Sequence, residues 1–150
     1  MVTENKRKFF RVHFERPLLA EIKLIGLQDR DFEPDIKNFK AAVVDIGAGG
    51  ARFFTETPLP DAHRLLVEMK FTVLGKQYNP LGTIVRSILP EEGHNEYSSE
   101  FSLQESETAA LTSMLNSVAI KLRKSKTPAE CIFCSDEDLA AFMPLRARKP

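Results

Sequence analysis

A long alternation of apolar and polar residues near the beginning of the chain limits what it can fold into. Between Val12 and Leu24, apolar residues recur at even positions and mostly polar residues fill the odd positions. Successive side chains of a strand point to opposite faces, so this period of two predicts a strand with one buried face. Arg16-Pro17 predicts a bend or an edge position within that strand, because proline cannot donate to a strand ladder.

Five further apolar segments follow, separated by turn-forming residues and without a helical pattern between them. Gly26–Asn38, which is charged, predicts a loop. The predicted strands are about Phe39–Ile46, Ala51–Phe54, Leu65–Val73, Gln77–Leu89, which is broken by Pro80 and Gly82, and Glu96–Ser102. Six short strands with turns between them are typical of an antiparallel β-barrel or a β-sandwich.

The period changes after Phe101, where apolar residues fall at helical spacing on one side only. They are Leu111, Met114, Leu115, Val118 and Leu122. We predict an amphipathic helix from about Glu105 to Lys124, capped by Ser102 or Ser106. This helix would lie on the barrel or cover one of its open ends.

A tail follows Thr127-Pro128, which ends the first helix. We predict a second short helix from Ser135 to Met143, capped by Ser135 or Asp136. The tail also holds Cys131-Ile132-Phe133-Cys134, which is half of a zinc-site spacing without a second half. Semi-buried cysteines are the favoured interpretation, and a metal shared across a dimer is the alternative.

Composition excludes several classes of protein. Basic and acidic residues are balanced at 21 each, whereas a protein that coats DNA is normally basic overall. No apolar run approaches the roughly 20 residues of a membrane helix, and no signal-peptide pattern follows the N-terminus, so we expect a cytoplasmic protein. The length suits one domain, which we divide into a basic arm (1–11), a barrel with its helix (12–124) and a tail (125–150).

A glycine-rich segment lies between the second and third predicted strands. Gly47-Ala48-Gly49-Gly50 is flanked by apolar residues, and Asp45 stands at its entrance. Glycine permits positive φ and leaves no Cβ in the way of a ligand, so the segment predicts a tight hairpin or a bulged corner. Asp45 either bonds nearby backbone N–H groups as a turn former or faces outward to accept donors from a ligand.

A basic arm precedes the first strand. Arg7 and Arg11 stand four residues apart, with Phe9 and Phe10 between them. In an extended arm, residues four apart project to the same side. Two guanidiniums on one side can clamp phosphates through paired N–H donors or stack on a flat base. The alternative is a solvated cluster of charges at the N-terminus.

The arm and the corner together resemble the PilZ domain family, bacterial receptors for the second messenger cyclic di-GMP. Members of that family carry an RxxxR arm and a [D/N]xSxxG corner in this order and at this separation. The matching segments here are Arg7-x-x-x-Arg11 and Asp45-x-Gly47-x-x-Gly50.

The resemblance extends to about residues 5–124. Gly82–Arg86 looks like the family's later glycine-to-arginine strand. Tyr97–Phe101, followed by an acidic helix start, looks like its last strand and C-terminal helix. The resemblance implies a six-stranded antiparallel barrel plus a C-terminal helix.

The family's site can be carried over residue by residue. Arg7 and Arg11 match the arginines that bind phosphates and guanine faces, and Asp45 matches the acid that accepts from a guanine edge. Gly50 matches the glycine that lets the ligand approach. Gly47 departs from the family, which usually has serine there. A lost hydrogen bond of ~0.5–1.5 kcal/mol would weaken binding about two- to tenfold, so Gly47→Ser is expected to tighten it.

The resemblance implies a receptor. No nucleophile elbow, phosphate loop or metal-ligating HxxxH motif is present, so we expect that the protein is not an enzyme. Cyclic di-GMP is the implied ligand, often as a stacked dimer, and motility, pilus or exopolysaccharide machinery is the implied class of partner. Arg52 and Arg86 are secondary candidates that a solvent-facing strand position would equally explain. A homodimer is compatible with the sequence.

Two alternatives remain at this point. The first is an adaptor of the same fold that binds a protein without ligand. The second is a small-barrel nucleic-acid binder, which would need an exposed aromatic strand face and a positive groove.

Overall fold

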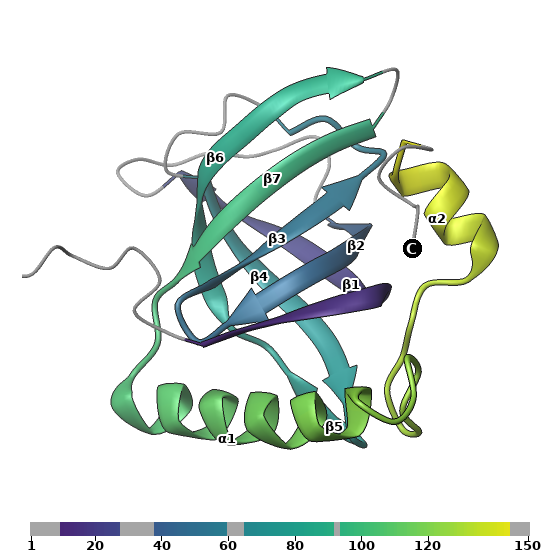
Figure 1. The fold of residues 1–150 in the computed structure, drawn as a ribbon. Coiled ribbons are helices and arrows are strands. Elements are labelled where there is room, and N and C mark those ends of the chain that lie inside the picture. Colours follow the sequence, from purple (N-terminus) through teal and green to yellow (C-terminus); the bar gives the residue numbers. More distant parts are fainter. Residues whose placement is uncertain (1–9, 28–37, 60–64, 92–93, 145–150) are drawn as a thin grey trace, which may run out of the picture.

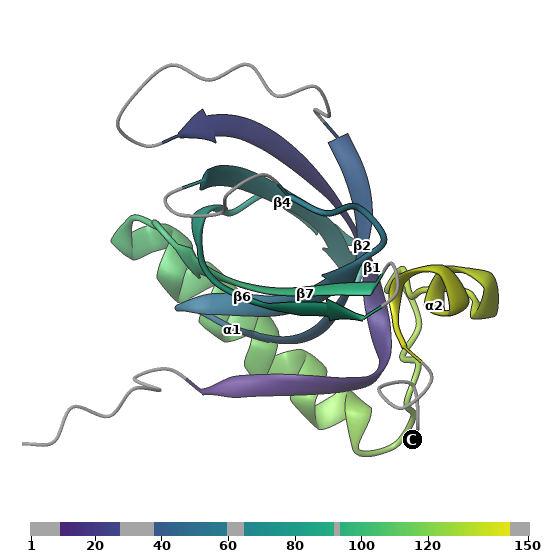
Figure 2. The same ribbon diagram turned by 90° about the horizontal axis from the view of Figure 1, so that it is seen from above.

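The computed structural model describes residues 10–27, 38–59, 65–91 and 94–144. Its strands are β1 (Arg11–Leu27), β2 (Asn38–Gly47), β3 (Gly50–Thr55), β4 (Leu65–Val73), β5 (Lys76–Tyr78), β6 (Leu81–Glu91) and β7 (His94–Phe101). They run in the order β1-β2-β3-β7-β6-β4, and β4 pairs back with β1. This closes a six-stranded antiparallel barrel, as predicted, with β5 as a short extension beside β4 (Figures 1 and 2).

The long strand β1 bends where the sequence predicts it. Its pairing register with β2 shifts between His13 and Leu18, the interval that contains Arg16-Pro17. The first part of β1 pairs with β2 alone, and residues from Glu21 onward also pair with β4. One bent strand therefore serves as the neighbour of two others, which is how the barrel closes.

The predicted break at Pro80 is confirmed, because the segment Gln77–Leu89 is divided into two strands, whereas the predicted break at Gly82 is wrong, because Gly82 lies inside β6. Asn79-Pro80 separates β5 from β6, and proline has no N–H with which to continue a ladder. Both strands pair with β4, β5 near its end and β6 near its beginning. Because of this interruption, β4 pairs with both β5 and β6 on the same side.

Two helices follow the barrel, α1 (Glu105–Leu122) and α2 (Asp136–Phe142). The cap of α1 is Gln104, whose backbone N–H donates to Glu107 at 2.8 Å, so the predicted serine caps are wrong. The predicted cap of α2 is confirmed, because Ser135 accepts from the Asp138 N–H at 3.0 Å. Figure 1 shows α1 across the lower end of the barrel and α2 beside the ends of β1 to β3.

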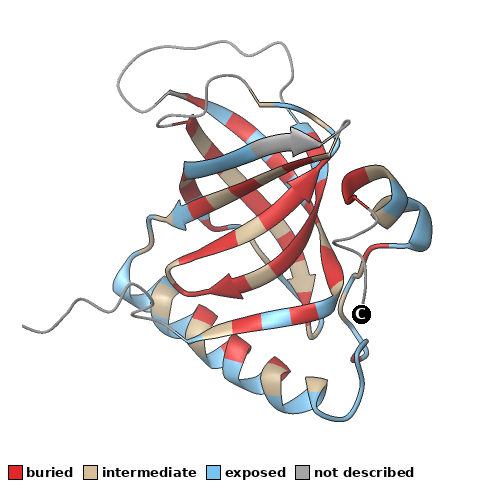
Figure 3. Cartoon of the chain, turned by 45° about the horizontal axis from the view of Figure 1, so that its top comes forward, coloured by how far each residue is buried: buried red, intermediate tan, exposed pale blue. Residues whose placement is uncertain are grey.

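The barrel interior is the main core, and Figure 3 shows buried residues along the strands and on one side of α1. The even-numbered apolar residues of β1 are all buried, as the alternation predicts. The helix contributes Leu111, Met114, Leu115 and Val118. Because these side chains join the same cluster as the strands, α1 acts as a plug for the end of the barrel.

The tail segment 130–134 lies between β1 and the β4–β5 turn. Its backbone bonds to β1 through Leu19 N–H to the Ile132 carbonyl (3.0 Å) and Cys134 N–H to the Pro17 carbonyl (2.9 Å). On its other side, the Ile132 N–H donates to Thr72 at 3.2 Å. The segment thus supplies backbone partners at the bend of β1.

A second apolar cluster forms outside the barrel, where α2 covers the outer faces of β2 and β3. Its strand members are Ala42, Val44 and Phe54, and its tail members are Cys134, Phe142 and Met143. Arg16 holds the beginning of α2, because it donates to the Cys134 carbonyl at 2.7 Å and to Asp136 at 2.8 Å. Among the described residues, no helix is long and apolar enough to cross a membrane.

Candidate functional site

The glycine-rich corner is a tight hairpin between β2 and β3. Gly47 and Gly50 form its closing pair around Ala48-Gly49. Counting outward from this pair places Asp45 opposite Arg52. The two residues are therefore brought together by the turn itself. Arg52 is a secondary candidate in the sequence, and this count is the signal that would have placed it beside Asp45.

Gly50 is required by a close approach to β7 and not by a positive φ. Among the described glycines, positive φ occurs at Gly26 and Gly75, outside the corner. A Cβ on Gly50 would lie 2.1 Å from the Ser99 carbonyl oxygen. Any side chain there would force β3 and β7 apart, because real Cβ atoms do not approach backbone oxygens so closely.

Gly47 is required by a close approach of the beginning of β1. A Cβ on Gly47 would lie 2.9 Å from the Phe10 carbonyl oxygen and 3.0 Å from Arg11 Cγ. The absence of a side chain at this position therefore lets the residue pair Phe10-Arg11 lie directly against the corner. A serine at position 47 would push these atoms away.

Asp45 is engaged on both carboxylate oxygens. Oδ1 accepts from Nη2 of Arg11, and Oδ2 accepts from Nε of Arg52 at 3.1 Å. The Asp45 side chain is 17% exposed, so these bonds are partly shielded from water. Two of the five predicted site residues, Arg11 and Asp45, are thus in direct contact across 34 residues of sequence.

Arg52 extends this contact to β7. Its Nη1 donates to Oε2 of Glu96 at 2.7 Å, while its Nε remains on Asp45. Partial burial alone lowers the pKa of the Arg52 guanidinium, but the bond to Glu96 and the charge of Asp45 outweigh it and raise that pKa. The guanidinium is therefore always charged.

Arg11, Asp45, Arg52 and Glu96 form a continuous chain across β1, β2, β3 and β7, which we call the ion-pair chain. It contains two positive and two negative charges, so it is formally neutral. Arg86 is exposed on β6, opposite Ser98, which is in turn opposite Arg52. Arg7 lies outside the described residues.

The two cysteines of the tail pack against different clusters. Cys131 is half-buried against the barrel core, and its Sγ accepts from the Leu74 N–H at 3.4 Å. Cys134 is buried in the outer cluster, and burial raises the pKa of its thiol to about 12. In the part of the chain that the structure describes, no group of three or more His, Cys, Asp or Glu side chains is placed to hold a metal ion.

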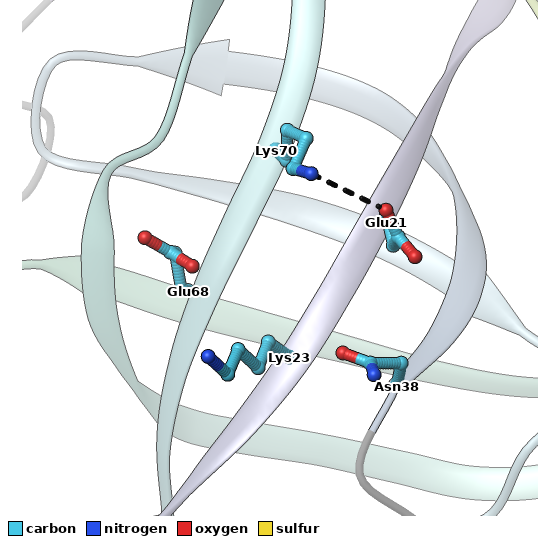
Figure 4. A pocket seen from close by; sticks show the side chains of 5 residues that line it. All are labelled: Glu21, Lys23, Asn38, Glu68 and Lys70. Atoms are coloured by element: carbon cyan, nitrogen blue, oxygen red, sulfur yellow. Dashed lines mark ion pairs between the residues drawn. The ribbon is translucent and has the colours of Figure 1, made fainter.

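A surface hollow of about 270 Å³ lies elsewhere, over β1, β2 and β4 (Figure 4). It is lined by Glu21, Lys23, Asn38, Glu68 and Lys70. Glu21 stands opposite Lys70, with 3.6 Å between their charged atoms, and Lys23 stands opposite Glu68. Such cross-strand pairs of opposite charge stabilise a sheet by about 0.2–1 kcal/mol each, which accounts for these side chains without a ligand.

The chain matches known proteins both by sequence model and by fold. The family model described as PilZ domain matches residues 5–117. Among solved structures, the chain is similar to the inhibitor of motility MotI (DgrA) of Bacillus subtilis, with 14% identity, a TM-score of 0.53 and coverage of 81% of this chain and 54% of that chain. It is also similar to the PilZ domain of YcgR from Escherichia coli with c-di-GMP (15% identity, TM-score 0.52, 80% and 96% covered).

A third similar structure is the MrkH–c-di-GMP complex of K. pneumonia (14% identity, TM-score 0.57, 81% and 56% covered). The chain therefore spans about half the length of the B. subtilis and K. pneumonia proteins and nearly all of the E. coli domain. At these identities, the structural likeness shows the fold alone. No curated protein matches the chain by sequence.

Proposed function

This chain belongs to the PilZ domain family, and we propose that it is a non-enzymatic receptor for cyclic di-GMP. Two of the similar structures contain c-di-GMP, which supports the choice of ligand. The observation that carries the proposal is the direct contact of Arg11 with Asp45 at the corner. It joins the end of the arm to the acid that would recognise a guanine edge.

The ion-pair chain suggests how the ligand would bind. To bind the ligand in this way, Asp45 must accept from guanine N–H donors, whereas each of its two oxygens accepts from an arginine in the structure. Arg11 would leave Asp45 and move to a ligand phosphate, where a guanidinium can donate two parallel bonds. Binding thus exchanges one ion pair for another, so only the difference between the two contributes to affinity.

The positive charge for an anionic ligand comes from this exchange. In the resting state, Arg11 is neutralised by Asp45 and the ion-pair chain has no excess charge. Once Arg11 faces the phosphates, Arg7 on the same arm would add a second guanidinium. Closing of the arm would then change the surface that the protein presents to a partner.

Titration calorimetry with cyclic di-GMP tests the proposal. We expect heat of binding at micromolar protein and tens of micromolar ligand. Arg7→Ala, Arg11→Ala and Asp45→Ala should each weaken binding about tenfold or more, because charge-assisted bonds contribute about 1.5–3 kcal/mol. Asp136→Ala, which removes a largely exposed carboxylate from the tail, is the matched control and should bind as the wild type does.

Absence of binding heat from the wild-type protein, with the fold intact, would refute the receptor proposal. Unchanged affinity in Arg11→Ala or Asp45→Ala would refute the proposed site.

A second candidate function is an adaptor that keeps the barrel and binds a protein without ligand. The observation that favours it is that Asp45 already has a partner on each oxygen, so the site is satisfied in the free protein. Wild-type calorimetry separates the two functions. A nucleic-acid binder is less favoured, because Phe10 is the only aromatic among the exposed large hydrophobic residues of the described chain.

The partner and location belong to the same proposal. One similar structure is an inhibitor of motility, which supports motility machinery as the class of partner to test first. A cytoplasmic location remains a prediction from the sequence.

A further inference from the structure

Arg52 and Glu96 lie next to the proposed ligand site, and neither belongs to the arm or to the motif of the corner. Arg52 bonds to Asp45 through Nε and to Glu96 through Nη1, at 3.1 and 2.7 Å. The Glu96 side chain is only 17% exposed, so its bond to Arg52 is partly shielded from water. From these contacts we infer that Arg52 is a positioning residue, which fixes the Asp45 carboxylate for the ligand and is itself fixed by Glu96.

The two arginines on Asp45 differ in how they are held. Arg11 is the first residue of β1, and its guanidinium is described in one ion pair, with Asp45. Arg52 lies inside β3, between β2 and β7, and bonds to carboxylates on both of those strands. Removing Arg52 from Asp45 would require breaking or straining its bond to Glu96 as well. Arg11 is therefore the arginine that the ligand displaces, and Arg52 stays.

A fixed Arg52 gives Asp45 a defined orientation. With Oδ2 held by Nε of Arg52, the carboxylate cannot rotate freely, and Oδ1 becomes the free acceptor when Arg11 leaves. An acceptor that is already oriented loses less conformational freedom when a ligand binds. This inference rests on the proposed function, because it names a further residue of the same site.

The geometry requires arginine at position 52. Arginine is planar, and its Nε and Nη1 donors can reach two carboxylates at fixed positions, whereas lysine carries a single compact ammonium group. Lysine at position 52 would keep the charge and lose the double contact. Arg52→Lys should therefore behave like Arg52→Gln and not like the wild type.

The decisive variant is Glu96→Gln. An effect of charge alone and a positioning role of Glu96 predict opposite changes in the affinity for cyclic di-GMP. Removing a negative charge near the site of an anionic ligand should tighten binding if only the charge matters. If Glu96 holds Arg52 on Asp45, the same change should weaken cyclic di-GMP binding about three- to tenfold. Glu68→Gln, in the hollow over β1 and β4, removes the same charge away from the site and is the control.

Calorimetry of wild type, Glu96→Gln, Arg52→Lys and Glu68→Gln measures these effects. Weaker binding in Glu96→Gln and Arg52→Lys, with Glu68→Gln unchanged, supports the inference. Tighter or unchanged binding in Glu96→Gln, or wild-type binding in Arg52→Lys, overturns it.

Solvent exchange of the Arg52 Nε–H, followed by nitrogen-15 NMR in the ligand-free protein, provides a second measurement. Exchange should be slower than for the exposed Arg123 and should accelerate in Glu96→Gln. Equal exchange in wild type and Glu96→Gln overturns the claim that Glu96 fixes Arg52. A wild-type protein that binds no ligand overturns the proposed function and the ligand part of this inference, while the exchange rates still decide the role of Glu96.

Discussion

At Asp45, two guanidiniums from different strands meet one carboxylate. Exposed ion pairs contribute at most about 1 kcal/mol to the free energy of unfolding. The pairs of the ion-pair chain are only partly exposed, so they stabilise the fold as well as form the site. A ligand has to replace part of this contribution. The affinity for the ligand therefore depends on the ion pair that Asp45 loses as well as on the bonds that the ligand forms.

For serine at position 47, the family resemblance and the structure predict different effects. The family resemblance implies that serine would add a hydrogen bond to the ligand. The structure adds a cost, because any Cβ at position 47 would lie 2.9 Å from the Phe10 carbonyl oxygen. The two effects can be separated by comparing alanine, which has the Cβ alone, with serine, which has the Cβ and the hydroxyl.

We predict that Gly47→Ala weakens cyclic di-GMP binding and lowers the melting temperature, because the Cβ moves Phe10-Arg11 away from the corner. Gly47→Ser should lower the melting temperature similarly and bind about two- to tenfold more tightly than Gly47→Ala. Calorimetry and thermal denaturation of the two variants measure this difference. Equal affinities of the two variants would mean that the hydroxyl has no role in binding. Melting temperatures equal to that of the wild type would mean that the beginning of β1 moves away from the corner without loss of stability.

Cys134 gives the protein a predicted sensitivity to alkaline pH. Burial raises the pKa of its thiol from 9.0 to about 12, so the folded state keeps the proton that the unfolded chain releases above about pH 9. The stabilisation is complete below pH 9 and is lost as the pH rises towards 12.

The free energy of unfolding should therefore fall more steeply with rising pH in the wild type than in Cys134→Ala. Urea denaturation of both proteins between about pH 8 and pH 10.5 measures the two slopes. Parallel slopes would show that the thiol does not contribute to the pH dependence.

At the scale of secondary-structure elements, the sequence predicts those with a clear period and misses details that depend on backbone partners. The even-numbered apolar residues of β1 and the one-sided stripe of α1 are sufficient to predict their buried faces. Pro80 predicts the division between β5 and β6, whereas the cap at Gln104 was missed, because it depends on which backbone groups meet in three dimensions.

Ligand binding by the candidate site residues stays a prediction, but the sequence accounts for part of their arrangement. The arm-and-corner motif identifies Arg11 and Asp45, which are in contact. Glu96 belongs to a strand far along the chain, and no local pattern relates it to the corner. Its role follows only from the pairing of β3 with β7.

The tail contributes to the fold through α2 and the segment 130–134. Phe142 is buried in the outer cluster with Val44 and Phe54, which precede Asp45 and follow Arg52 along their strands. We predict that Phe142→Ala destabilises the protein by about 3 kcal/mol, as expected for a buried aromatic residue. Ile132→Ala, at a position that is 51% exposed on the same tail, is the control and should cost much less.

Thermal denaturation of the two variants measures the contribution of α2. For a chain of 150 residues, the loss at Phe142 should lower the melting temperature by roughly 6–12 °C. If Phe142→Ala and Ile132→Ala were equally mild, α2 would not be packed against the barrel in solution.

The whole molecule is a closed barrel with a helix over one end and a neutral ion-pair chain across its outer face. The hollow over β1, β2 and β4 lies on other parts of the barrel and holds none of the proposed site residues. A ligand that binds as proposed should therefore affect one region of the surface and leave the hollow unchanged.

The most direct test of this account is a nitrogen-15 NMR titration of the full chain with cyclic di-GMP. The backbone amide signals of Arg11, Asp45, Gly47, Gly50 and Arg52 should shift most, because these residues form or flank the proposed site. The signals of Glu68 and Lys70 in the hollow should not move. The account is contradicted if saturating ligand leaves the corner signals in place, or if the largest shifts come from the hollow.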